Sequence, residues 1–166
     1  MEASTRESCQ IKSESHGVVV ESVIQDKTET YTYTLHATHD WEFRDITIRA
    51  NGRKLEVRRT GEVWEVSGQL RSDLQEAYEV DISASPPSNT LPIRRLHLAV
   101  GVSADITTAY IRIPELDVVT DPQRYTRISQ NEYLYESRDS DFRRTVTVDG
   151  EGLVIEYPGL FIREDT

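Results

Sequence analysis

The chain has 166 residues and a formal net charge of −10, from 19 basic and 29 acidic side chains. Of the basic residues, 16 are Arg and three are Lys. Because contact with phosphate needs a basic surface, this balance argues against a nucleic-acid partner and against electrostatic attachment to anionic membranes. Hydrophobic residues make up 37% of the chain, and eight Tyr, three Phe and two Trp are available to anchor a core, so a mainly disordered chain is excluded.

The length predicts one domain over residues 1–166, with a polar, flexible tail at residues 1–6. No apolar run approaches the roughly 18 residues of a spanning helix, and the acidic start of the chain is unlike a secretory signal. The single cysteine, Cys9, excludes an internal disulfide framework. We therefore expect a cytoplasmic protein with no stable membrane insertion.

The first half of the chain shows the period-two alternation of half-buried strands. In Thr28–Leu35, Tyr and Leu share one face and Thr occupies the other. In the next run the apolar positions change register between Phe43 and Ile46, which predicts a β-bulge near Arg44 and Asp45. Three short runs follow, the first of them after the Asn51-Gly52 hairpin signal: Leu55–Val57, Trp64–Val66 and Tyr78–Ile82.

A break comes at Ser85–Ser88, where two adjacent prolines cannot continue a strand ladder. A short helical turn is expected next, because Thr90 suits its start, Pro92 its first turn, and Arg94 and Arg95 its end. Strands then resume at Ile106–Ile113, Val118–Thr120, Tyr125–Ile128, Tyr133–Glu136, Phe142–Val148, Leu153–Tyr157 and Leu160–Ile162.

This order of elements indicates the fold class. Many short strands with at most one short helical turn must roll or stack to bury one face of their sheet. We therefore predict an all-β fold, built as a strongly curved antiparallel sheet that closes partly into a barrel.

Motifs for metal binding and catalysis are weak. His36, His39 and Asp40 are close in sequence, but positions three apart point to opposite faces of a strand, which favours ordinary surface histidines. No Gly-x-Ser-x-Gly elbow is present, and no phosphate-cradling glycine motif precedes a helix. The sequence therefore predicts no metal, no cofactor and no catalytic residue; it leans toward a non-catalytic protein and leaves an enzymatic role open.

The segment Ser88–Leu96 is unusual because two adjacent arginines, Arg94 and Arg95, follow an apolar stretch. A guanidinium fork there is suited to hold a carboxylate or phosphate group at the mouth of an apolar cavity. Alternatively, one of these arginines ties the crossover to an acidic strand residue such as Asp81, and this structural interpretation is the favoured one.

The same segment carries a family resemblance. Asn89–Leu96, with Gly101 after it, is similar to the central motif of a bacterial and archaeal family named for glycolipid binding. Further motifs of this family extend the resemblance from about Glu7 to Arg163: Tyr31-x-Tyr33, Asp40-Trp41 with Arg44, Val80-Asp81, Ala109-Tyr110-Ile111, Pro114-x-Leu116, Gln123-x-Tyr125-Thr126, Tyr133-x-Tyr135, Val148-Asp149, Gly152-Leu153-Val154 and Tyr157-Pro158-Gly159-Leu160.

The resemblance implies a spiral β-roll similar to bacterial carriers of lipoproteins and lipids, and a glycolipid or lipid-like ligand. The family's glycolipid role is itself inferred from this likeness of fold. Two departures bear on ligand choice, because Pro87-Ser88 stands where the family commonly has an aromatic residue, and Gly61 is the one glycine of a turn that is usually glycine-rich.

Together these observations give three hypotheses. The first is a non-catalytic binding protein for a glycolipid or other amphipathic ligand, with aromatic rings as apolar walls and polar tips. The second is an enzyme acting on a small polar metabolite near Asp81, Arg94 and Arg95, and the third is a structural or protein-interaction module. The candidate ligand-binding residues are Trp41, Arg44, Trp64, Asp81, Asn89, Arg94, Arg95, Tyr125, Tyr133 and Tyr157. The oligomeric state is left open.

Overall fold

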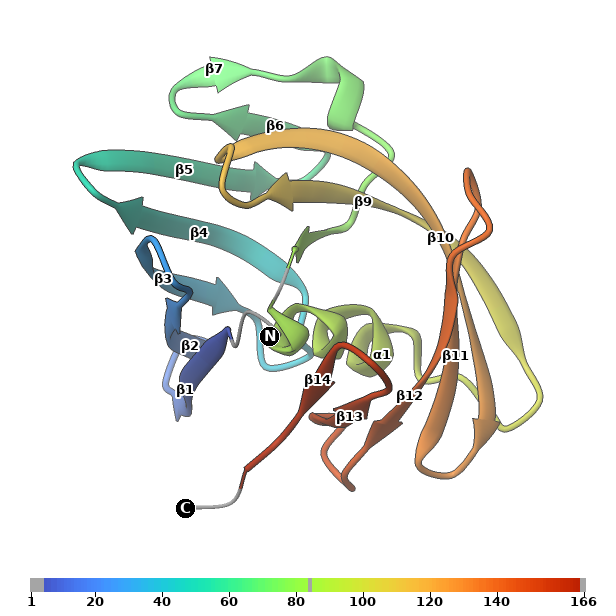
Figure 1. The fold of residues 1–166 in the computed structure, drawn as a ribbon. Coiled ribbons are helices and arrows are strands. Elements are labelled where there is room, and N and C mark those ends of the chain that lie inside the picture. The colour runs from blue at the N-terminus through green and yellow to red at the C-terminus, as the bar shows by residue number, and fades with distance from the viewer. Residues whose placement is uncertain (1–4, 84, 165–166) are drawn as a thin grey trace.

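The computed structural model describes residues 5–83 and 85–164, which form two seven-stranded sheets (Figure 1). The first sheet is an antiparallel meander in chain order. Its strands are β1 (Arg6–Glu14), β2 (Gly17–Gln25), β3 (Thr30–Ala37), β4 (Phe43–Ala50), β5 (Arg53–Thr60), β6 (Val63–Val66) and β7 (Gln69–Leu70).

The second sheet has the order β14-β13-β12-β11-β10-β9-β8, and all its pairs are antiparallel except β8 with β9. A parallel pair needs a long crossover, and here a 3₁₀ turn and a helix supply it. The strands are β8 (Glu79–Ile82), β9 (Ser103–Arg112), β10 (Asp117–Ser129), β11 (Glu132–Ser137), β12 (Arg143–Val148), β13 (Val154–Tyr157) and β14 (Phe161–Ile162). The helical elements are η1 (Ser72–Leu74), η2 (Pro86–Asn89) and α1 (Thr90–Leu96).

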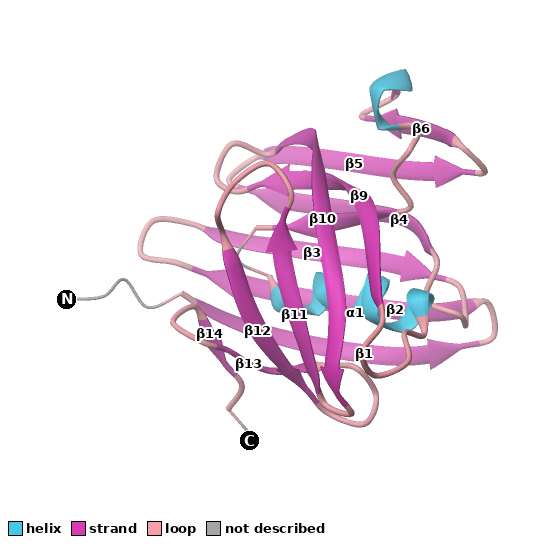
Figure 2. Cartoon of the chain, turned by 90° about the vertical axis from the view of Figure 1, so that its right-hand side faces the viewer, coloured by secondary structure: helices cyan, strands magenta, loops and turns pink. Residues whose placement is uncertain are grey.

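Strong curvature of the second sheet confirms the predicted all-β roll. The long strand β10 bends across the molecule, and β8–β14 curl into a half-barrel around η2 and α1 (Figure 1). Figure 2 shows α1 lying behind β10–β12, on the concave side of that sheet. Residues Thr90–Ile93 of α1 are buried there, so the helix fills the concavity.

Two hydrophobic clusters form the core. The larger packs Ile46, Ile48 and Trp64 of the first sheet against Val80 and Ile111 of the second. The smaller lies inside the half-barrel, where Ile93 and Leu98 of the crossover pack on aromatic and aliphatic side chains of β10–β13. Because β8 and β9 contribute to the larger cluster, burial of apolar area joins the two sheets.

The predicted bulge is confirmed. His36 pairs with Asp45 and Ala37 pairs with Phe43, so Arg44 is the extra residue on β4. Phe43 and Ile46 are therefore both buried on the same side, as their change of register requires.

Other boundaries differ from the sequence expectations. β1 and β2 lie outside the predicted runs, because the side chains of β1 are almost all exposed and show no alternation. The predicted strands at 118–120 and 125–128 are one strand, β10, which passes through Pro122. The Pro122 carbonyl oxygen accepts from Arg138 N at 2.9 Å, so the backbone of Pro122 faces away from β9 and its missing N–H leaves the β9–β10 ladder intact. Residues 1–4 of the expected tail lie outside the described residues, and β1 begins at Arg6.

Candidate functional site

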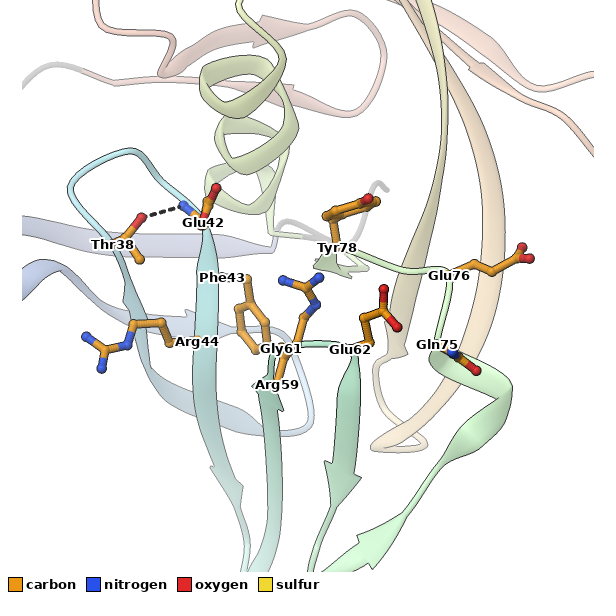
Figure 3. Close-up of a pocket in the computed structure, with 10 residues that line it drawn as sticks. All are labelled: Thr38, Glu42, Phe43, Arg44, Arg59, Gly61, Glu62, Gln75, Glu76 and Tyr78. Atoms are coloured by element: carbon orange, nitrogen blue, oxygen red, sulfur yellow. Dashed lines mark hydrogen bonds between the residues drawn. The ribbon is translucent and has the colours of Figure 1, made fainter.

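An open groove of about 800 Å³ lies at the rim where β4, β5 and the start of β8 approach one another (Figure 3). We call it the rim groove; its lining residues are Thr38, Glu42, Phe43, Arg44, Arg59, Gly61, Glu62, Gln75, Glu76 and Tyr78. Five of these ten residues are charged and none is aliphatic, so its chemistry suits a polar, hydroxyl-rich group. Figure 3 shows Arg59, Glu62 and Tyr78 extending toward a common centre, whereas Arg44 points away from it.

Period-two alternation on β5 explains how an arginine reaches this groove. Leu55 and Val57 are buried in the core, and Arg59 is the next residue on their face. Beneath the groove, Phe43 stacks on Trp64 with ring centroids 5.5 Å apart, and the indole Nε1 of Trp64 donates to the Ala77 carbonyl oxygen at 3.2 Å. The floor is therefore a packed aromatic pair, while the walls are polar.

Tyr78 connects the groove with the crossover helix. Its side chain is 51% exposed, and two guanidinium groups lie over its ring, Arg59 at 5.0 Å and Arg95 at 4.5 Å from the centroid. Such cation–π contacts hold a large exposed ring in one position.

The Nε of Arg59 is buried and has no hydrogen-bond partner among the described residues. The N–H group at Arg59 Nε is therefore a hydrogen-bond donor at the edge of the groove that is available to a ligand.

Alternation on β8 sends Glu79 and Asp81 to the side opposite Val80 and Ile82, toward the crossover. Arg95 donates from Nε and Nη2 to the two carboxylate oxygens of Glu79, at 2.8 and 3.0 Å. Burial raises the pKa of the Glu79 carboxyl, and the Arg95 guanidinium opposes that shift. The fork of Arg95 is thus occupied by an internal carboxylate, which agrees with the favoured structural interpretation except that the partner is Glu79 rather than Asp81. The helix runs back along β8, so its last turn meets the start of that strand.

A second polar group, here called the polar cluster, surrounds Asp81; its members are Asp81, Ser88, Thr108, Asp121 and Gln123. The Nε2 of the fully buried Gln123 lies 2.7 Å from Asp81 Oδ2, 2.8 Å from Asp121 Oδ2 and 3.2 Å from Thr108 Oγ1. Ser88 donates to Asp81 Oδ1 at 3.1 Å. Burial raises the pKa of Asp81 to about 6, against the lowering effect of the bonds from Gln123 and Ser88. One neutral amide thus lies between two carboxylates and joins β10 to β8, while Ser88 joins η2 to β8.

Three of the candidate aromatic residues line the half-barrel and are buried. Tyr125, Tyr133 and Tyr157 are each at most 8% exposed, and the Tyr125 hydroxyl accepts a hydrogen bond from Asn89 Nδ2 at 2.9 Å. The binding hypothesis makes such rings the apolar walls of an open cavity, whereas the simpler alternative is that they fill the core of the curved sheet. In the structure, they share a core cluster with Ile93 of α1, and Tyr125 and Tyr157 both contact the ring of Tyr135, because the crossover occupies the concave side of the sheet.

The candidate residues therefore separate into distinct places. Arg44 lines the rim groove, Trp64 lies under it, and Arg95 contacts it through Tyr78. Asp81, Asn89 and the three tyrosines belong to the half-barrel interior. Arg94 donates to the Glu151 carbonyl oxygen and its guanidinium lies 5.7 Å from the centroid of the Trp41 ring, so it has partners different from those of Arg95.

Arg59, Glu62 and Tyr78 were not singled out from the sequence. Arg59 is one of 16 arginines and Glu62 is in a turn, so neither stands out before β5 is placed beside β8. A usable signal was present in β5, where the alternation of Leu55 and Val57 predicts that Arg59 faces inward.

Comparisons with known proteins agree with this architecture. The fold is similar to a crystal structure, at 1.80 Å resolution, of a DUF1089 family protein from Pseudomonas aeruginosa. The TM-score is 0.88 at 32% sequence identity, over 99% of this chain and 94% of the other. Among curated proteins, no match was found. In the part of the chain that the structure describes, no helix has the length and apolar character needed to cross a bilayer. A family model with the description "Putative glycolipid-binding" matches residues 1–163, and the chain belongs to that family.

Proposed function

We propose that this protein binds the carbohydrate headgroup of a glycolipid in the rim groove, as a non-catalytic binding protein. The observation that carries the proposal is the lining of the groove, in which the exposed ring of Tyr78 stands beside Arg59 and Glu62. Sugars present hydroxyl groups that donate to carboxylates and accept from guanidinium groups, and flat C–H faces that pack on aromatic rings. The description of the family supports the same ligand class.

The acyl part of such a ligand has no counterpart in the groove. The lining lacks aliphatic residues, and the concave side of the half-barrel is filled by η2 and α1. We therefore expect the protein to recognise the sugar while the lipid tails stay in the membrane or micelle. With a net charge of −10, attraction to anionic lipid contributes nothing to affinity, so local contacts must supply it.

Two binding measurements test the proposal. An array of neutral and acidic glycans identifies the sugar, and titration of its methyl glycoside into the protein, followed by tryptophan fluorescence, gives the affinity. Arg59→Met and Glu62→Ala are each expected to weaken binding by about tenfold or more, equivalent to about 1.4 kcal/mol. Arg58→Met is the matched control, because Arg58 lies next to Arg59 on β5 but faces the opposite side.

The lipid tail is tested separately. A short-chain alkyl glycoside below its micelle concentration is expected to bind no more than about threefold tighter than the methyl glycoside, because no apolar surface receives the chain. Absence of saturable binding to every glycan, or equal weakening by Arg58→Met and Arg59→Met, would overturn the proposal.

A further inference from the structure

A second hollow adjoins the rim groove beside η1. It has a volume of about 410 Å³, and Gln75 and Glu76 line both it and the rim groove. These two residues lie in the segment between η1 and β8, and Figure 3 shows their side chains directed away from the centre toward which Arg59, Glu62 and Tyr78 extend. The two hollows therefore meet along this segment, and we call the second one the η1 depression.

The segment between the hollows is held in place from both sides. Leu74, at the end of η1, is fully buried, and the indole Nε1 of Trp64 donates to the Ala77 carbonyl oxygen at 3.2 Å. On the other side, Arg71 donates from Nη2 to the Val118 carbonyl oxygen of β10 at 2.9 Å. A ligand that crosses this segment therefore meets a preformed surface and loses little affinity to ordering of the protein.

Strands β9 and β10 contribute hydroxyl groups to the η1 depression. Thr108 faces the polar cluster inside the half-barrel, so its neighbour Thr107 faces outward. Thr120 and Pro122 of β10 share that outward face, because Thr107 pairs with Pro122 and Ala109 pairs with Thr120. All three outward residues line the depression. Two hydroxyl groups, which both donate and accept, thus stand beside the apolar ring of a proline.

The helical turn η1 contributes Ser72 and Asp73 to the depression. Arg71 donates to the two carboxylate oxygens of Asp73, from Nε and Nη2, at 2.8 Å each. This bidentate contact fixes the carboxylate, and since an ionised carboxylate has about four lone-pair sites, Asp73 can still accept hydrogen bonds from a ligand. The η1 depression thus offers groups that bind sugar hydroxyls, as the rim groove does.

We propose that the carbohydrate headgroup is an oligosaccharide, with its chain lying across Gln75 and Glu76 and one end in each hollow. Resting on the proposed function of the rim groove, this assignment adds the size of the ligand. Pockets of about 300–1,000 Å³ enclose drug-sized ligands, so the rim groove, at about 800 Å³, is already larger than a single hexose requires. Since each hydroxyl group that leaves water needs a partner, the η1 depression supplies partners for further sugar units. Affinity is therefore expected to rise with the length of the glycan.

Calorimetric titration tests the role of chain length. The probes are the methyl glycosides of glucose, galactose and mannose, together with di- and trisaccharides of the same sugars. For the sugar that binds, the trisaccharide is expected to bind about tenfold tighter than the monosaccharide, because it fills both hollows.

Paired substitutions locate the additional contacts. Thr107→Val with Thr120→Val removes two hydroxyl groups from the η1 depression at nearly constant side-chain size, and valine suits a strand as well as threonine does. This variant is expected to bind the trisaccharide about tenfold more weakly and the monosaccharide with unchanged affinity. Thr34→Val with Thr47→Val is the matched control, because these threonines pair across β3 and β4, lie outside both hollows and should leave both affinities unchanged.

Failure of this assignment is distinguishable from failure of the groove function. Equal affinity for the monosaccharide and the trisaccharide, or equal effects of the two paired variants on the trisaccharide, would overturn the oligosaccharide assignment while the groove function stands. A monosaccharide that is weakened as much as the trisaccharide by Thr107→Val with Thr120→Val would overturn it as well. Absence of binding to every probe would overturn the groove function itself.

Discussion

Asp81 shows how a single residue acquires chemistry from its surroundings. Its carboxyl shares the Gln123 amide with Asp121, and burial raises its pKa from 3.8 to about 6. The folded protein therefore binds this proton more tightly than the unfolded chain does. Ionisation of Asp81 favours unfolding, an effect that is absent below pH 3.8, grows as the pH rises to about 6, and is constant above that.

We expect Asp81→Asn to change this pH dependence. Relative to the wild type, the free energy of unfolding of the variant should rise by about 2 kcal/mol between pH 4 and pH 7, as measured by urea unfolding across that range. Asp105→Asn is the control: Arg124 holds the pKa of that surface carboxyl below its usual 3.8, so the carboxyl is ionised in both the folded and the unfolded chain over most of this range, and the difference should stay nearly constant. A pH-independent difference for Asp81→Asn would contradict the assignment.

At the scale of elements, η2 and α1 form a crossover that is hydrogen-bonded to several strands of the half-barrel. Ser88 binds Asp81, Asn89 binds Tyr125, the hydroxyl of Thr90 donates to the Gly152 carbonyl oxygen at 2.9 Å, and Arg95 binds Glu79. The crossover thus contacts β8, β10 and the loop before β13. Because these polar groups are buried or half-buried, loss of one partner leaves the other without compensation.

Of these contacts, the ion pair between Arg95 and Glu79 is expected to contribute most to the free energy of unfolding. Arg95→Met leaves the fully buried Glu79 unpaired, so the free energy of unfolding at pH 7.5 should fall by about 3 kcal/mol or more. The deficit should shrink as the pH falls, because burial raises the pKa of Glu79 and the protonated carboxyl no longer needs a charged partner. Arg94→Met, one residue earlier on the same helix, should cost at most about 1 kcal/mol, since Arg94 makes a solvent-exposed hydrogen bond to the Glu151 carbonyl oxygen and has no buried carboxylate as partner. Equal losses for the two variants would show that Arg95 and Glu79 do not form the principal contact.

The two sheets behave as one unit at the scale of the whole molecule, because the larger core cluster includes residues of both. Ile111 on β9 is fully buried in that cluster, whereas both tryptophans belong to the half of the chain that forms the first sheet. A change in the stability of the second sheet should therefore be detected by tryptophan fluorescence, which arises in the half of the chain that forms the first sheet.

Ile111→Ala is accordingly expected to lower the stability reported by tryptophan fluorescence by about 2–4 kcal/mol, through loss of buried methyl groups and the cavity left behind. Fluorescence and far-ultraviolet circular dichroism should give coincident urea transitions, as two-state unfolding requires. An unchanged fluorescence midpoint in this variant would mean that the sheets unfold separately.

Local patterns were sufficient for much of the fold. Alternation predicted β3–β6 and most strands of the second sheet, the Arg44 bulge followed from a change of register, and Pro92 and the two arginines marked α1. β1 and β2 escaped detection for a physical reason: β1 is an exposed edge strand with no buried face, and Val18–Val20 at the start of β2 form a continuous buried run without alternation.

The pattern of residues along the chain was enough to establish the all-β class and the helical crossover. The places where charged residues meet depend instead on the three-dimensional arrangement of the strands. The partner of Arg95 is Glu79, the half-barrel is filled by α1, and the groove gathers Arg59, Glu62 and Tyr78 from β5, a turn and the start of β8. Period-two alternation is a local property of a strand and fixes the face of each side chain. Pairing of charges depends on how distant strands approach, which the curvature of the sheet and the path of the crossover determine.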